Sequence, residues 1–151
     1  MKRHLATLGV KLEFFNVERH IVSPYVFPRN GGYYIQFPDN ITVIEAGGCL
    51  GVDVETVILP ETVQTIGRAA FMGSQIRSII LPDSLKVIEE DAFAACVNLQ
   101  KVFLPPHLTK IGARAFMGCT SLEEVNLLGN VQFIGDDAFS FCPNLHPFQS
   151  R

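Results

Sequence analysis

The stretch LPDSLKVIEEDAFAACVNLQKVF, residues 81–103, decides the fold, because the chain repeats it on both sides. Residues 104–126 read LPPHLTKIGARAFMGCTSLEEVN, and residues 59–80 read LPETVQTIGRAAFMGSQIRSII. Two more divergent copies begin at Phe37 and Leu127, so five units follow one another at offsets of 22, 22, 23 and 23 residues. Such a period indicates that each unit buries its apolar face only by stacking on its neighbours.

Each unit ends in a segment that predicts one short strand. Leu99, Val102 and Leu104 have the spacing of inward-facing residues on a strand with an adjoining bend. The matching sets are Val54, Val57 and Leu59; Ile76, Ile79 and Leu81; and Leu122, Val125 and Leu127. Stacked units should therefore give a parallel sheet whose strands lie about 4.8 Å apart. A proline that cannot donate to the ladder should end the strand in four units, at Pro38, Pro60, Pro82 and Pro105.

The middle of each unit predicts a short helical turn on the opposite, convex side. The segments are IGRAAFMG (66–73), IEEDAFAAC (88–96) and IGARAFMGC (111–119). The acidic run from Glu89 to Asp91 would lie near the start of such a turn, where the helix dipole favours negative charge. A column of phenylalanines, each preceded by alanine, belongs to the predicted core: Phe71, Phe93, Phe116 and Phe139.

The combined pattern LPxSLxxIxxxAFxxCxxLxxVxLP resembles the BspA-type leucine-rich repeat, over residues 37–148. The resemblance implies a right-handed leucine-rich-repeat solenoid of the α/β type, with a parallel β-sheet on its concave face. It also implies use as a protein-binding or adhesion module, and larger members of the family are often surface proteins.

Residues 37–151 are predicted to hold the five repeats, and residues 1–36 an N-terminal β cap that forms one structural unit with them. The segment VKLEFF (10–15) alternates as a strand would, and FPRNGGYYIQF (27–37) places a turn-prone Asn-Gly-Gly between two strand-prone runs. A solenoid end must cover its open core, which favours a cap. The departure from the repeat could equally be functional.

Composition excludes several classes of function. The formal net charge is −3 and charged residues make up 18% of the chain, which argues against nucleic acid as a partner. No apolar run approaches the roughly 18 residues of a membrane span. The basic start MKRH is followed by an apolar stretch that Lys11 interrupts, so we expect no secretory signal and a cytoplasmic location. A surface or secreted location would follow if the chain is a fragment.

No constellation of residues predicts catalysis, a metal or a cofactor. Cys96, Cys119 and Cys142 share one column, and a straight ladder of thiols does not give the converging ligands of a zinc site, so we expect buried core cysteines. The Gly-rich GGCLG (47–51) lacks the Lys-Ser/Thr of a phosphate loop. The pair Asp136 and Asp137 suits solvated capping better than calcium binding. The histidines have no repeated nucleophile beside them: His4, His20, His107 and His146.

The outward positions of the predicted sheet are the candidate binding surface for another protein. They form two rows across the stack: Tyr34, Thr56, Ser78, Lys101 and Glu124, and Gln36, Ile58, Ile80, Phe103 and Asn126. The second row should present an apolar stripe, as interaction sites often do. The alternative is that such residues merely suit a pleated sheet, or that the cap folds over them.

The sequence thus predicts a protein-binding module that inhibits or scaffolds its partner through the concave face. A homo-oligomeric structural protein or a surface adhesin is the alternative, because the last strand leaves an open edge for pairing. An enzyme is the least favoured class.

Overall fold

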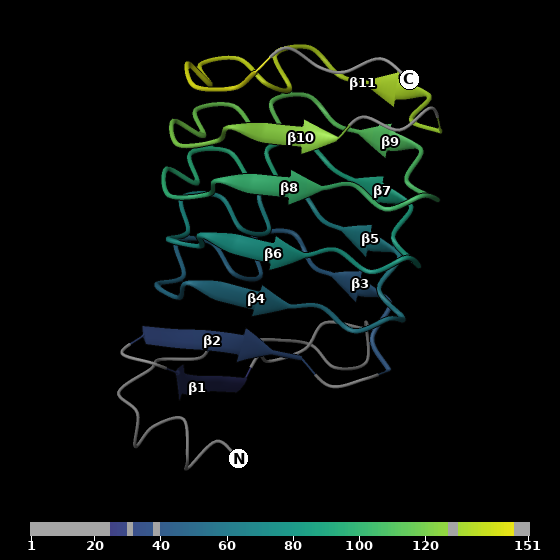
Figure 1. Ribbon diagram of the computed structural model, residues 1–151. Coiled ribbons are helices and arrows are strands. Elements are labelled where there is room, and N and C mark those ends of the chain that lie inside the picture. Colours follow the sequence, from purple (N-terminus) through teal and green to yellow (C-terminus); the bar gives the residue numbers. More distant parts are fainter. Residues whose placement is uncertain (1–24, 30–31, 38–39, 127–129, 147–151) are drawn as a thin grey trace.

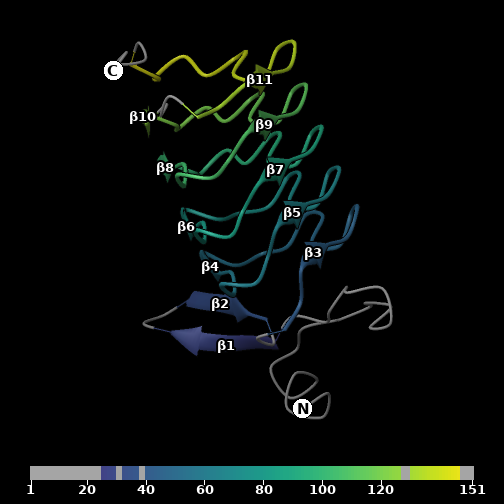
Figure 2. The ribbon, with the colours of Figure 1, turned by 90° about the vertical axis from the view of Figure 1, so that its right-hand side faces the viewer.

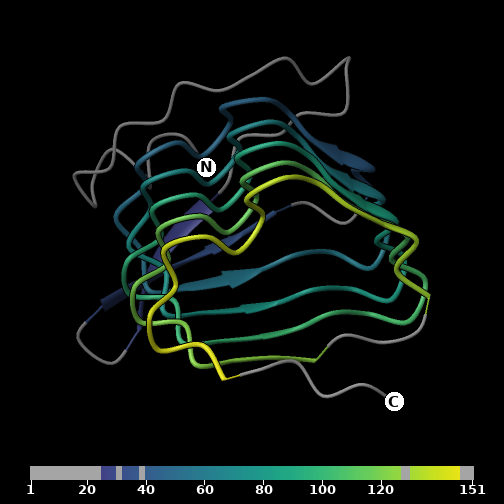
Figure 3. The same cartoon turned by 90° about the horizontal axis from the view of Figure 1, so that it is seen from above.

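The computed structural model describes residues 25–29, 32–37, 40–126 and 130–146, which form one stack of coils (Figure 1). Each coil is one repeat. Seen along the stack, a coil has two sides made of strands and one side made of turns (Figure 3). The predicted leucine-rich-repeat solenoid with a parallel sheet is confirmed.

One side of the stack is a six-stranded sheet, sheet A, in the order β1-β2-β4-β6-β8-β10. Its strands are β1 (Tyr25–Arg29), β2 (Gly32–Gln36), β4 (Thr56–Ile58), β6 (Ser78–Ile80), β8 (Lys101–Phe103) and β10 (Glu124–Asn126). From β2 onward the strands are parallel, and residues one repeat apart lie side by side, as Val57 and Ile79 do. β4, β6 and β8 each end two residues before a proline, as predicted for Pro60, Pro82 and Pro105, whereas Pro38 lies outside the described residues.

A second parallel sheet, sheet B, was not predicted. It runs beside sheet A along the stack (Figure 2) and consists of β3 (Val43–Ile44), β5 (Thr65–Ile66), β7 (Val87–Ile88), β9 (Lys110–Ile111) and β11 (Phe133–Ile134). Strands of two residues are too short to show an alternating pattern, although Ile66, Ile88 and Ile111 point into the core as a column.

The predicted helical turns are wrong, because none of the described residues forms a helix. The N–H of Phe71 donates to Ala92 O of the next coil at 2.8 Å, and Gly73 N–H donates to Ala94 O at 2.8 Å. A helix would use these donors within its own coil. Left-handed backbone at Ala69 (φ 55°) and Gly73 (φ 71°) instead produces successive turns, which direct alternate N–H groups toward the neighbouring coil.

The core lies between the two sheets and the turns. The predicted inward residues of all the described strands are buried, from Val54, Val57 and Leu59 at one end to Leu122 and Val125 at the other, and Leu127 lies outside the described residues. The phenylalanine column forms a continuous stack of nearly parallel rings with centroids 5.2–5.3 Å apart: Phe71, Phe93, Phe116 and Phe139.

At the amino-terminal end, β1 pairs antiparallel with β2, which confirms the hairpin predicted around Asn-Gly-Gly. β2 occupies the position of a repeat strand, since Tyr34 is the partner of Thr56 in the parallel ladder. The strand predicted over residues 10–15 lies outside the described residues. The division into a cap of residues 1–36 and five repeats stays a prediction.

The cysteine column is part of the core. Its members Cys96 and Cys119 are buried and Cys142 is half-buried, and Cys49, which holds the position of the phenylalanine column one coil before Phe71, is also buried. The thiol of Cys96 donates to Phe71 O at 3.1 Å, and Cys119 and Cys142 repeat this contact with the next two phenylalanine carbonyls at 3.1 and 3.2 Å. Ser74, which the sequence reading did not assign, takes the same column one coil earlier, and its Oγ lies 3.3 Å from Cys96 Sγ. The side chains of this column therefore tie each coil to the one before it.

Within the described ranges, no helix has the length and apolar character needed to cross a membrane.

Candidate binding surfaces

The outer face of sheet A carries the predicted binding residues on neighbouring strands. Ser78, Lys101, Glu124, Ile80 and Phe103 are exposed. Three more are half-buried: Thr56, Ile58 and Asn126. The backbones of Tyr34 and Gln36 lie in register with β4, but their side chains are outside the described part of the structure.

Ile58, Ile80 and Phe103 form a band across three successive strands, which we call the apolar stripe. Ile58 and Ile80 are direct partners in the parallel ladder. Ile80 is 66% exposed and Phe103 is 57% exposed, whereas Ile79, next to Ile80 on the same strand, is buried. Alternation along each strand therefore gives the core its own apolar residue and leaves a second one facing solvent.

Polar residues border the apolar stripe. Lys101 Nζ lies 3.9 Å from Glu124 Oε1, and both side chains are more than half exposed, so this pair adds little stability. A further exposed row of polar residues was not predicted from the sequence. It consists of the residues just before the strands of sheet A: Glu55, Arg77, Gln100 and Glu123. The signal was present, because these residues stand in one repeat column directly before each strand.

Asn126 serves the fold. Its Oδ1 accepts the N–H of Leu104 at 2.6 Å, and its Nδ2 donates to Leu104 O at 3.4 Å. These bonds join β10 to the residue that directly follows β8 in the preceding coil. The amide is therefore less available to a partner than the exposed residues of the same row.

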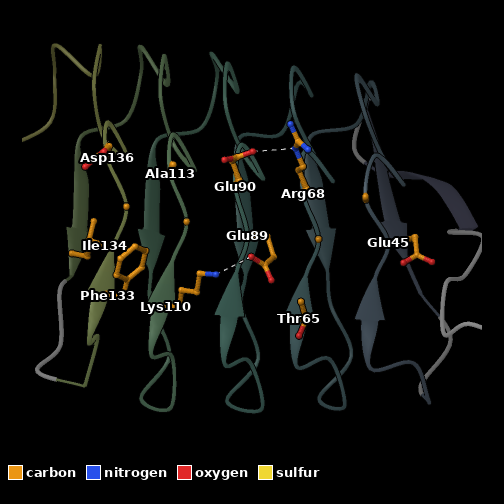
Figure 4. A pocket seen from close by; sticks show the side chains of 14 residues that line it. Glu45, Thr65, Arg68, Glu89, Glu90, Lys110, Ala113, Phe133, Ile134 and Asp136 are labelled. Atoms are coloured by element: carbon orange, nitrogen blue, oxygen red, sulfur yellow. Dashed lines mark hydrogen bonds and ion pairs between the residues drawn. The ribbon is translucent and has the colours of Figure 1, made fainter.

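A trough of about 760 Å³ runs along the outer side of sheet B (Figure 4). Its basic side chains are already paired: Arg68 Nε lies 3.1 Å from Glu90 Oε1, and Lys110 Nζ lies 3.3 Å from Glu89 Oε1. Gly112 forms part of the floor of the trough. A larger residue would clash there, because a Cβ on Gly112 would lie 2.5 Å from Glu90 N. The charged groups of the trough thus hold neighbouring coils in register.

The acidic run beginning at Glu89 does not cap a helix, contrary to the sequence prediction. Asp91 instead accepts two hydrogen bonds from Arg114 of the next coil. Arg114 Nε donates to Oδ1 at 3.0 Å, and Nη2 donates to Oδ2 at 3.2 Å. The hydrogen bond to Asp91 and its negative charge raise the pKa of Arg114. The run therefore contributes to contacts between coils.

Two of the described thiols, Cys49 and Cys142, are held in the neutral form. Burial raises the pKa of Cys49 to about 12 and also raises that of Cys142, which keeps both as neutral thiols near pH 7. His107 Nδ1 lies 3.3 Å from Asp83 O, and His146 is exposed. His4 and His20 lie outside the described residues, within which no three His, Cys, Asp or Glu side chains are grouped to hold a metal ion.

The solved structures similar to this chain are bacterial leucine-rich-repeat proteins. The T. pallidum leucine-rich-repeat protein TpLRR has 28% identity and a TM-score of 0.71, over 90% of this chain and 71% of that one. A leucine-rich cell surface protein of Faecalibacterium prausnitzii has 27% identity and a TM-score of 0.68, over 86% of this chain but only 38% of that one. The pneumococcal vaccine antigen PcpA has 20% identity and a TM-score of 0.53, and the match spans 89% of this chain and 42% of PcpA. At this identity the likeness shows a shared fold alone.

The search of curated proteins found no match. The family model described as BspA type leucine rich repeat region matches residues 20–146 in six copies. The matched range includes β2, in agreement with its place as a parallel strand of the repeat ladder. On these grounds the chain belongs to the BspA-type leucine-rich-repeat family.

Proposed function

We propose that this protein binds another protein through the outer face of sheet A. The observation that carries the proposal is the apolar stripe, in which Ile80 and Phe103 are exposed on neighbouring strands beside Ile58. Leucine-rich-repeat proteins commonly mediate protein interactions, which supports the same reading.

The residues of the apolar stripe lie outside the buried core of the strands that carry them. The core of the same strands is supplied by the inward residues Val57, Ile79 and Val102. Covering a fully exposed Ile or Phe side chain gains about 1.5–3 kcal/mol, and that gain is open to a partner. Aromatic side chains near the centre of an interface are frequent anchors, so we place Phe103 and Ile80 at its centre, with Ser78, Lys101 and Glu124 around them.

A catalytic role is not part of the proposal, because repeat proteins of this family and fold are not typically enzymes. The expected cytoplasmic location stays a prediction. The F. prausnitzii relative is described as a cell surface protein, and a surface location for this chain would be compatible with the same mode of binding.

The test compares capture of partner proteins by the wild-type chain, by Ile80→Asp combined with Phe103→Asp, and by Leu50→Asp. Leu50 is 55% exposed and lies outside both sheets, so it is a matched control for an added surface charge. The wild type and Leu50→Asp should capture the same protein, and the double variant should bind it at least about tenfold more weakly, the equivalent of 1.4 kcal/mol. Equal affinity for all three would overturn the proposal, provided that circular dichroism shows the same fold.

A further inference from the structure

The trough on the outer side of sheet B has a floor that is partly free of side chains. The residues that directly follow the strands of sheet B form this floor: Glu45, Gly67, Glu89, Gly112 and Gly135. The coils come close together at the glycines, since a Cβ on Gly67 would lie 2.6 Å from Ile44 O. The hollow extends over all five strands of the sheet (Figure 4), and its volume of about 760 Å³ is within the usual range of clefts that bind ligands.

Acidic side chains outnumber basic ones along the trough. Four carboxylates line it against two cations: Glu45, Glu89, Glu90 and Asp136, and Arg68 and Lys110. Both cations are already paired, since Arg68 contacts Glu90 and Lys110 contacts Glu89. Glu45 and Asp136 form no ion pair with any residue that the structure describes. Each of these two carboxylates therefore leaves a negative charge that a cationic group would balance.

An aromatic side chain lines the trough on the same coil as Asp136. Phe133 is 53% exposed. Its register partner on β9 is Lys110, which also lines the trough, so Phe133 is exposed because it faces away from the core. A guanidinium stacks on aromatic faces and forms strong hydrogen bonds to carboxylates. Phe133 and Asp136 together therefore favour arginine at this position.

The separation of the two carboxylates sets the length of a segment that reaches both. Glu45 follows β3 and Asp136 lies just after β11, four strands along the sheet, which corresponds to about 19 Å at the usual spacing of neighbouring strands. An extended chain rises about 3.3 Å per residue, so this span takes about six residues. Residues an even number of positions apart point to the same side of an extended chain. One segment therefore brings two basic side chains into the trough at once.

We propose that the trough binds an extended segment of another protein with two basic residues six positions apart, of which the one beside Phe133 is arginine. The glycines of the floor let the backbone of such a segment lie close to the coils, and its two basic side chains reach Asp136 and Glu45. The ion pairs of Arg68 and Lys110 stay in place, because the segment uses the carboxylates that they leave unpaired. This site lies on sheet B and is independent of the function proposed for sheet A.

Fluorescence anisotropy at low ionic strength tests the proposal with the full chain and three labelled peptides of seven residues. The first consists of alanine and serine with arginine at both ends. The second has the same composition with its two arginines adjacent, and the third has glutamate in place of both arginines. We expect the first peptide to bind about two- to fivefold more tightly than the second, which reaches only one end of the trough, and the third not to bind.

Variants that each raise the net charge by one show where the first peptide binds. Glu45→Gln and Asp136→Asn should each weaken its binding about two- to fivefold, the effect of one partly exposed ion pair. Glu61→Gln is the control and should leave the affinity unchanged, because Glu61 is exposed and lies outside the trough and outside both sheets.

Ala113→Arg should block the trough near its middle. Arg68 and Glu90 hold the same position in the two preceding coils, so a long side chain fits there. Steric overlap and like charge should weaken binding of the first peptide at least about tenfold. The proposal would be overturned by equal affinities for the two arginine peptides, by binding of the glutamate peptide alone, or by no binding at all. Equal losses for Glu61→Gln and Asp136→Asn, or undiminished binding to a folded Ala113→Arg, would also overturn it.

Discussion

The ring of Phe116 lies on the ring of Phe93 with centroids 5.2 Å apart and planes 7° from parallel. Each of these two rings is fully buried and has a further ring on its other side. The column of phenylalanines therefore links residues that are far apart in sequence. A ring in the middle of the column should contribute more to the stability of the fold than the ring at its end.

Replacing Phe93 with alanine should lower the free energy of unfolding by about 3–5 kcal/mol, because it opens a cavity between two stacked rings. Phe139→Ala is the matched control, since Phe139 is half-buried in the last coil and should lose less. Urea unfolding followed by circular dichroism measures both. Equal losses would contradict a continuous core in which position along the stack matters.

Gly112→Ala should destabilise the protein by about 1–3 kcal/mol through overpacking, since its Cβ would meet backbone atoms of the preceding coil, including Glu89 C at 2.7 Å. Gly73 is left-handed with open space around it, and asparagine tolerates that backbone, so Gly73→Asn should lose less than about 1 kcal/mol. Thermal unfolding of the two variants tests the distinction. A larger loss for Gly73→Asn would show that backbone conformation and not close approach limits these positions.

Alkaline pH should weaken the fold partly through Cys49. Burial raises its pKa from 9.0 to about 12, so the neutral thiol is favoured in the folded chain. The stability that follows from this shift is fully present below about pH 9 and is lost as the pH rises toward 12. Between pH 9 and 11 the wild type should lose about 1–3 kcal/mol more than Cys49→Ala, at 1.36 kcal/mol per pKa unit.

Urea midpoints of the two proteins across that pH range give the difference directly, and groups that titrate in both cancel. Parallel curves for the wild type and Cys49→Ala would show that the Cys49 thiol is not protected by burial.

Arg114→Gln should lower the thermal midpoint at low salt, because Arg114 contacts Asp91 in the preceding coil and Glu90 beside it. Salt screens such partly exposed pairs, so the difference from wild type should shrink at high ionic strength. Arg77 is exposed and forms no ion pair with the described residues, which makes Arg77→Gln the control. A salt-independent effect at Arg114, or an equal one at Arg77, would argue against contacts between coils through this network.

The sequence predicted those parts of the fold that depend on one coil repeated. Alternation around Val102 placed the strand, the core and the exposure of Phe103, because side-chain direction in a strand follows from local spacing alone. The helical turns failed for the opposite reason. The apolar spacing around Phe71 suits a helix, but its N–H is bonded to a carbonyl in the next coil, which no local pattern reports.

The candidate site shows the same limit. The exposure of Ile80 followed from its place in the strand, whereas the half-burial of Asn126 depends on bonds to Leu104, 22 residues away in sequence. The left-handed backbone of Phe141 is likewise not predicted by the sequence, because the same position in other coils is held by Ala95 as well as by Gly73 and Gly118.

Site-specific photo-crosslinking tests the proposed function of sheet A most directly. A photoreactive phenylalanine analogue is placed at Phe103 in one sample and at Leu50 in another, and each protein is irradiated with the partner captured by the wild-type chain. We expect a crosslink to the partner from position 103 and none from position 50. Crosslinking from position 50 with none from position 103 would contradict binding through the apolar stripe.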